Sequence, residues 1–294
     1  MNGLINCHAK CQVVGSRSLF LAATVVGVLL TLSIFAFMVM LGLPLFSVHS
    51  LTLLLTQAWA PDQGLYGVFP FICGTCAIVS LSLLIAFPLS LGNAILIHLL
   101  APRRLARFLH QVVKMMTGVP TVIYGFVGIF FLVPLVREWF SRGSGMCILS
   151  AALLLALLIS PTMILVFLES FAAIPATHLR ALEALGGTRR QKLLHVILPG
   201  ARTGIITGLL LALGRALGDT MIALMVAGNA TAQPESLLDS VRTLTAHIAL
   251  VMAADFDSIE FKTIFACGII LYLWTAVLTL SLRYLHFNSA KLKS

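Results

Sequence analysis

The sequence predicts an all-α protein that crosses a membrane several times, and two features of its composition carry this prediction. Of its 294 residues, 60% are hydrophobic and only 10% are charged, whereas charged residues make up about 25% of an average soluble domain. The apolar residues also form continuous runs instead of alternating with polar ones. Continuous runs of about 20 residues are typical of membrane-spanning helices, because a helix satisfies its backbone polar groups internally.

Six apolar runs are long enough to cross a membrane. They cover Ser18–Leu43, Val68–Leu100, about Gln111–Val136, Met146–Phe171, Thr203–Gly228 and Ile259–Leu282. The first run is longer than the roughly 7–15 apolar residues of a signal peptide, so we interpret it as a membrane helix. Residues 1–17 then form a cytoplasmic N-terminal segment, and residues 18–294 form one six-helix transmembrane domain. Pro88 and Pro161 predict kinks in two of the helices.

The basic residues indicate how the six spans are oriented. Of the 19 lysines and arginines, 14 fall on one side of the membrane, four fall on the other, and Arg215 lies inside a span. Because basic residues accumulate in cytoplasmic loops, we expect both termini and the connection at residues 172–202 to be cytoplasmic. The pattern predicts a multi-pass protein of a bacterial-type cytoplasmic (inner) membrane.

The fifth run carries two charges near its middle. Arg215 lies about 18–20 Å from either end at ~1.5 Å per residue, and Asp219 follows one turn later. A charge at this depth costs at least ~2.5–3.5 kcal/mol, so both side chains should face protein or water. Helical spacing places them on one stripe with Gly204, Gly208 and Ala212. Such small residues allow another helix to approach closely.

Two interpretations of this charge pair are open. In the first, Arg215 and Asp219 form a salt bridge within the helix that only helps insertion. In the second, Arg215 lies in a translocation path, where its planar fork of donors suits phosphate and other oxyanions. Ionisable residues inside membranes are functional by default, and we therefore favour the second interpretation.

The third run contains an interruption, Thr117-Gly-Val-Pro-Thr-Val-Ile-Tyr-Gly125. Pro120 frees backbone groups, and Thr121 and Tyr124 carry hydroxyls, so the segment can add neutral hydrogen-bond donors to a path. A simple helix kink without a role in binding explains the same residues equally well.

The connection Ala172–Arg202 is too apolar for a solvated loop and predicts two short helices. The first ends at Gly186-Gly187, since glycine commonly stops a helix. Thr188 and Gln191 form a capping box for the second, which we expect to end before Pro199. Apolar residues with a basic rim are typical of a docking surface, although an amphipathic helix on the inner leaflet has the same pattern.

Gly186, followed ten residues later by Val196-Ile-Leu-Pro199, resembles the cytoplasmic loop of binding-protein-dependent ABC importer permeases. The usual form of that loop is Glu-Ala-Ala, three residues, Gly, nine residues, Ile-x-Leu-Pro. In the family it is the coupling helix, and it sits in a groove of the ATP-hydrolysing subunit. The resemblance implies this role for a loop that contains Ala181, Gly186, Gly187, Leu198 and Pro199. The sequence departs from the family at one position, where Arg180 stands in place of the family's Glu. The nearest acidic residue is Glu183.

A narrower resemblance points to phosphate. Gly214–Asn229 is similar to the signature of the phosphate-specific permeases, in which a Glu usually stands at Asp219, and Gly118–Phe126 and Thr243–Ile248 are similar to segments of the same proteins. The resemblance implies the type I ABC importer permease fold and a subunit of an inorganic phosphate importer. Arg215 would pair with the passing oxyanion, and Asp219 would hold Arg215 in place.

The same resemblance implies the partners. They are two ATPase subunits, a second permease subunit and an extracytoplasmic phosphate-binding protein, besides membrane lipid. The chain has no Gly-x4-Gly-Lys-Ser/Thr loop for binding ATP, so ATP and Mg should bind to the ATPase subunits. We therefore expect no cofactor, no enzymatic activity and no nucleic-acid partner for this chain by itself.

Three alternatives compete with phosphate import. Within the same family, the substrate could be sulfate, molybdate or an organic anion. A secondary anion transporter driven by an ion gradient would explain the charge pair and broken helices, but not the coupling-loop pattern. A membrane enzyme would need a catalytic cluster, and the eight histidines are scattered without metal-binding spacing.

Overall fold

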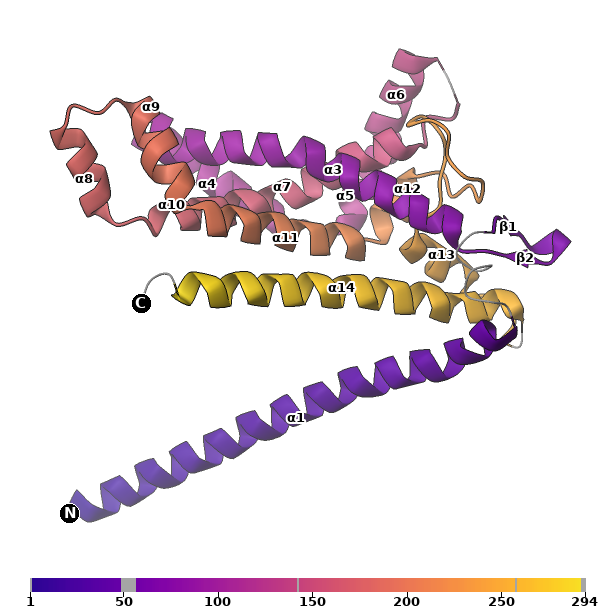
Figure 1. The fold of residues 1–294 in the computed structure, drawn as a ribbon, viewed down its shortest axis with the longest axis horizontal. Coiled ribbons are helices and arrows are strands. Elements are labelled where there is room, and N and C mark those ends of the chain that lie inside the picture. The colour runs from indigo at the N-terminus through magenta and orange to yellow at the C-terminus, as the bar shows by residue number, and fades with distance from the viewer. Residues whose placement is uncertain (1, 49–56, 142, 257, 292–294) are drawn as a thin grey trace.

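The structure is a computed structural model that describes residues 2–48, 57–141, 143–256 and 258–291. Long helices that run roughly along one direction dominate the fold (Figure 1). They are α1 (Asn2–Val48), α3 (Phe69–Ile95), α7 (Ile148–Ala172), α11 (Arg202–Gly218) and α14 (Ile259–Lys291). The shorter helical segments are η2 (Leu96–Leu100), α4 (Arg103–Thr117), α5 (Thr121–Val127), η3 (Gly128–Leu132), α6 (Val133–Phe140), α8 (Ala176–Ala184), α9 (Arg189–Gln191), η4 (Lys192–Ile197), α10 (Leu198–Gly200), α12 (Met221–Val226) and α13 (Leu244–Val251).

The predicted all-α membrane architecture is confirmed. Five segments are long and apolar enough to cross a membrane: Leu19–Gly42, Phe69–Leu100, Thr121–Phe140, Ile148–Ala172 and Ile259–Tyr284. A sixth span is obtained when α11 is taken together with Arg189–Gly200, from which it is bent by 65°. Pro88 and Pro161 lie inside the continuous helices α3 and α7, and α1 includes residues 2–17 without a break before the first span.

The predicted start of the third span is wrong. A separate helix, α4, covers Arg103–Thr117, and the chain breaks at Gly118 before α5 begins at Thr121. Pro120 explains the break because proline lacks an N–H and disfavours helical backbone in the preceding residue. The third span therefore runs over Thr121–Phe140.

The prediction of a single helix over the fifth apolar run is wrong, because the run forms two helices. Helix α11 ends at Gly218, Asp219 has extended backbone angles, and α12 begins at Met221. The backbone N–H of Ile222 donates to Asp219 Oδ2 at 2.9 Å. A short acidic side chain that bonds a backbone N–H three residues later stabilises a helix start in place of a helix interior.

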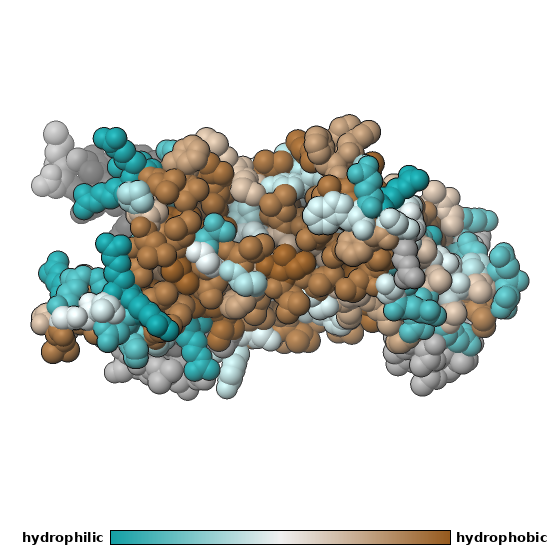
Figure 2. Space-filling model, turned by 90° about the horizontal axis from the view of Figure 1, so that it is seen from above, coloured by the Kyte–Doolittle hydropathy of each residue, from teal (hydrophilic) through white to brown (hydrophobic). Residues whose placement is uncertain are grey.

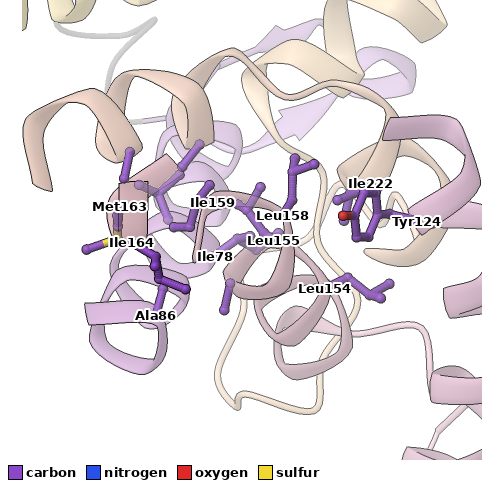
Figure 3. Close-up of a cluster of buried hydrophobic side chains, with 14 of the residues drawn as sticks. Ile78, Ala86, Tyr124, Leu154, Leu155, Leu158, Ile159, Met163, Ile164 and Ile222 are labelled. Carbon is purple, nitrogen blue, oxygen red and sulfur yellow. The ribbon is translucent and has the colours of Figure 1, made fainter. Parts of the chain in front are cut away.

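Helix α7 is the centre of the fold. It contacts α3, α4 and α11, and side chains along its length, among them Ile159, Met163 and Phe167, are fully buried. Figure 3 shows α7 residues gathered with Ile78 and Ala86 of α3. Tyr124 of α5 and Ile222 of α12 lie at the edge of the same cluster. The broken helix and the third span thus meet at the central helix.

A smaller apolar cluster lies at the end of the molecule opposite α8 and α9 (Figure 1). The strands β1 (Trp59–Ala60) and β2 (Leu65–Tyr66) pair antiparallel there, joined by the 3-10 turn η1 (Pro61–Gln63). The Trp59 ring packs on Phe71 of α3 and on His247 of α13. His247 belongs to α13, a helix within the long connection between α12 and α14. This helix was not predicted from the sequence.

The surface agrees with a membrane location. Figure 2 shows hydrophobic residues across the middle of one face and hydrophilic residues gathered toward both ends. Both ends of the described chain lie toward the end of the molecule that carries α8 and α9 (Figure 1). This arrangement is the one that an even number of spans predicts.

Candidate functional site

The predicted small-residue stripe of α11 packs against α7, and we call this contact the α7–α11 seam. A Cβ atom on Gly204 would collide with Ser170 Oγ, and one on Gly208 would lie 2.7 Å from Phe167 Cε1. Ala212 is fully buried on the same face. The helices are antiparallel, so residues later in α11 contact residues earlier in α7. The seam brings Arg215 to the level of Thr162.

Arg215 is held by a neutral residue and not by an acid. Its Nη1 donates a hydrogen bond of 2.8 Å to Thr162 Oγ1 on α7. Among the described residues the only ion pair joins Lys192 and Glu183, so Arg215 and Asp219 do not form the salt bridge of the first interpretation. Because the helix ends at Gly218, Asp219 no longer stands one helical turn above Arg215.

Asp219 instead organises the break between α11 and α12. Its carboxylate accepts the Ile222 N–H at 2.9 Å, and its carbonyl accepts the hydroxyl of Thr245 at 3.0 Å. Thr243 and Thr245 lie 3.1 Å apart through their hydroxyl oxygens, and with Asp219 and Thr75 they line a small cavity beside the break. Asp219 therefore links the broken helix to the start of α13.

The structure places Tyr124 and Thr121 on α5, directly after the interruption. The Tyr124 hydroxyl donates to the Met116 carbonyl of α4 at 3.2 Å, and the ring is buried next to α12. The Tyr124 hydroxyl thus links α5 to the end of α4 across the break between them. Thr121 is partly exposed in the first turn of α5.

The α8–α10 insert forms two short helical segments, as predicted. Gly186 has a φ of +74°, a left-handed conformation that glycine adopts without the steric cost of a Cβ atom. A Cβ atom on Gly187 would lie 2.8 Å from the Leu182 carbonyl oxygen. Thr188 and Gln191 form the predicted capping box at the start of α9. The two glycines thus close a tight turn between the helices.

The second segment of the insert does not end before Pro199. It continues through α10 to Gly200 and then bends by 65° into α11. Pro199 lies in the first turn of α10, and the break in helix regularity falls in the preceding π-helical segment η4. Leu198 is partly buried there, whereas Pro199 is exposed.

The outer face of the insert carries exposed apolar and charged residues. Leu185 is 85% exposed, and Arg180, Ala181 and Glu183 are exposed beside it. Glu183 pairs with Lys192 across the glycine turn, and this hydrogen bond and charge lower the pKa of the Glu183 carboxyl. The acid nearest to the family's Glu position is therefore engaged within the chain.

His247 is a buried titratable residue at the opposite end of the molecule. The Thr263 hydroxyl donates to the Glu260 carbonyl at 2.6 Å, so its oxygen accepts the N–H of His247 Nε2 at 3.0 Å. Within the described structure His247 Nδ1 has no hydrogen-bond partner. Burial, together with the charge of Arg242, lowers the pKa of His247 to about 3.

Two residues of this site, Thr162 and Thr245, were not predicted from the sequence. Thr162 follows Ser160-Pro161 in the middle of an apolar run, and a hydroxyl beside an internal proline is the only local signal. Its contact with Arg215 spans 53 positions of sequence. Thr245 lies in a segment, Thr243–Ile248, that was noted only for its resemblance. Neither contact follows from local spacing.

Comparisons with known proteins identify the family. A family model described as "Binding-protein-dependent transport system inner membrane component" matches residues 86–289. The "Probable ABC transporter permease protein YqgH" of Bacillus subtilis (strain 168) is 32% identical over 278 residues, which cover 92% of this chain and 90% of that protein. The "Phosphate transport system permease protein PstC" of Pasteurella multocida (strain Pm70) is 34% identical over 254 residues, covering 79% and 78%.

A solved structure agrees with this result at the level of the fold. The "Crystal structure of a bacterial ABC transporter involved in the import of the acidic polysaccharide alginate" contains a chain that aligns with a TM-score of 0.61 at 16% identity. The alignment covers 95% of this chain and 98% of the other. The chain therefore has the type I ABC importer permease fold and belongs to the family of binding-protein-dependent transport system inner membrane components, as a multi-pass permease subunit of an ABC importer.

Proposed function

We propose that this permease subunit forms part of the translocation path of an ATP-driven importer of inorganic phosphate. The observation that carries the proposal is Arg215, a guanidinium at the centre of the membrane domain whose structurally assigned partner is the neutral hydroxyl of Thr162. A cation without a carboxylate partner keeps its charge for an anionic ligand, and its planar fork suits a tetrahedral oxyanion. A relative named as a phosphate transport system permease supports the choice of phosphate.

The α8–α10 insert supports the coupling part of the proposal. The insert exposes two leucines, Leu185 and Leu194, among exposed charged residues, and an apolar surface with a charged rim is typical of one that a partner covers. The partner proposed is an ATPase subunit, which would bind ATP and Mg, with two such subunits in the assembly. A second permease subunit and an extracytoplasmic phosphate-binding protein complete it. The insert and both chain ends then face the cytoplasm.

The test is uptake of labelled inorganic phosphate by the assembled complex, normalised to the amount of inserted permease. We expect Arg215→Gln to lower uptake at least a hundredfold and Arg215→Lys to rescue it poorly, because a point charge lacks the bidentate fork. Asp219→Asn retains a side-chain oxygen for the Ile222 N–H, so this variant should still insert.

Unlabelled sulfate and molybdate serve as competitors in the same assay and test the choice of anion. Stronger competition by sulfate or molybdate than by unlabelled phosphate would assign the transporter to that anion. Wild-type uptake per molecule in Arg215→Gln would remove Arg215 from the mechanism.

A further inference from the structure

We propose that Thr162 is the positioning residue of the Arg215 site, and that its own hydroxyl proton faces the oxyanion together with the guanidinium. This inference rests on the proposed function of Arg215 in the path. It assigns the task of holding Arg215 to a residue on α7, in place of the Asp219 that the sequence suggested.

Hydroxyls in the membrane-embedded helices normally satisfy themselves locally. Ser82, Ser160, Ser170 and Thr207 all donate to a carbonyl three or four residues earlier in their own helix. This pattern is expected because an apolar environment offers a hydroxyl no other acceptor. These hydroxyls are therefore occupied and have no proton to offer a ligand.

Thr162 departs from this pattern. Its oxygen accepts the N–H of Arg215 Nη1 at 2.8 Å, and over the described ranges no acceptor is assigned to its own proton. A hydroxyl can accept one hydrogen bond and donate another at the same time. The pair thus presents an O–H donor beside the remaining N–H donors of the guanidinium.

The register of the α7–α11 seam fixes this pair. Gly204 faces Ser170 and Gly208 faces Phe167, and continuing the antiparallel contact leads from Ala212 toward Thr162. Gly208, Phe167 and Ala212 are buried in the seam, whereas Arg215 and Thr162 are only partly buried. The close packing of the two helices therefore fixes the register of the pair and leaves both side chains partly accessible.

A neutral holder has a consequence that an acidic one would not have. A carboxylate at the position of Thr162 would orient Arg215 but also neutralise it, and a passing anion would have to displace it. A threonine orients the guanidinium and leaves its charge uncompensated. The arrangement binds an anion through charge and hydrogen bonds while retaining a single fixed geometry.

The experiment compares Thr162→Val, Thr162→Ser and a control, Thr207→Val, in the assembled complex at saturating labelled phosphate. Thr207 is a matched control because its hydroxyl bonds only within α11, two turns from Arg215. We expect Thr162→Val to lower uptake per inserted molecule by about tenfold to a hundredfold, because it removes a hydrogen bond to a charged group. Thr162→Ser and Thr207→Val should both retain most of the uptake.

A double variant separates positioning from a general structural role. If Thr162 acts mainly by holding Arg215, Thr162→Val should cause a much smaller fractional loss in an Arg215→Gln background than in the native background, the remainder being its own hydrogen bond to the anion. An equal fractional loss in both backgrounds would overturn the inference, and so would wild-type uptake by Thr162→Val. Should Thr162→Val insert poorly, Thr162→Ala provides the same comparison without the added methyl group.

The two proposals fail in different ways. Loss of uptake in Arg215→Gln with full uptake in Thr162→Val would remove only the positioning role. Full uptake in both variants would remove Arg215 from the path, and the proposed function with it.

Discussion

The α7–α11 seam and the α8–α10 insert are neighbours in sequence but differ in how complete they are. In the seam, glycines face bulky side chains, Ala212 is fully buried, and Arg215 has a partner within the chain. In the insert, Leu185 is 85% exposed while the turn beneath it is fixed by two glycines and a capping box. Close packing within the chain fixes the seam, whereas the insert holds a fixed shape whose apolar surface is left uncovered. Substitutions of the seam glycines should therefore act on folding, and substitutions on the outer face of the insert should act on assembly.

The largest effect should come from adding one methyl group to the seam. Gly204→Ala places a Cβ atom against Ser170 Oγ, and overpacking of this kind costs about 1–3 kcal/mol. Gly214→Ala is the control on the same helix, because a Cβ atom there meets nothing within 4 Å. Thermal unfolding of the purified complex should show a lower Tm for Gly204→Ala and an unchanged or higher Tm for Gly214→Ala. Equal Tm values would contradict the close approach of α7 and α11.

The second effect should appear in assembly and not in folding. Leu185→Ser removes an apolar side chain that is worth about 1.5–3 kcal/mol when a partner buries it fully. We expect the permease to keep its Tm while its affinity for the ATPase subunit falls at least tenfold. Leu237→Ser, at a residue that is 52% exposed in the connection between α12 and α13, should leave this affinity unchanged. A loss of Tm without a loss of affinity would show that Leu185 supports the fold.

The third effect concerns the turn of the insert. Thr188→Ala removes the hydroxyl that accepts the Gln191 N–H at 3.3 Å, and loss of such a cap costs about 1 kcal/mol. Hydrogen exchange of the amides in α9 and η4 should become several-fold faster, while the seam amides are unaffected. Thr188→Ser retains the acceptor and should exchange like the native protein. Faster exchange throughout α11 would show that the insert and the seam unfold together.

The smallest effect should come from the exposed ion pair. Lys192 lowers the pKa of Glu183 from its ordinary value of 4.5, so the pair stabilises the insert above pH 4.5. This contribution is lost as the pH falls through the lowered pKa of the folded state. Hydrogen exchange of α8 amides, corrected for intrinsic rates, should therefore respond to pH below 4.5 in the native protein but not in Glu183→Gln. An identical pH response in both proteins would contradict this assignment.

The two regions also differ in what their sequences could predict. The stripe of small residues, the glycine turn and the capping box are all defined by local spacing, and the structure confirms each of them. Apolar composition continues to Gly228 and therefore predicts a helix that extends through Asp219. Composition contains no information about the Asp219 carboxylate, which accepts a backbone N–H and starts a new helix.

The partner of Arg215 could not be predicted from the local sequence either. Asp219 is four residues away and has the right charge, whereas Thr162 is 53 positions away and neutral. The contact depends on the antiparallel register of two helices, which only their packing determines. The roles of Arg180, Thr121 and Tyr124 in coupling and transport stay predictions.

His247 adds no pH-dependent charge to the end of the molecule opposite the insert. Its imidazole is neutral, with the proton on Nε2 fixed by Thr263, and its pKa of about 3 lies well below the ordinary value of 6.5. Histidine usually gives a surface a charge that changes between pH 5 and 8, but this one keeps the same proton count throughout that range. A mildly acidic medium therefore adds no charge to His247. Of these two neighbouring residues, only Arg242 is charged.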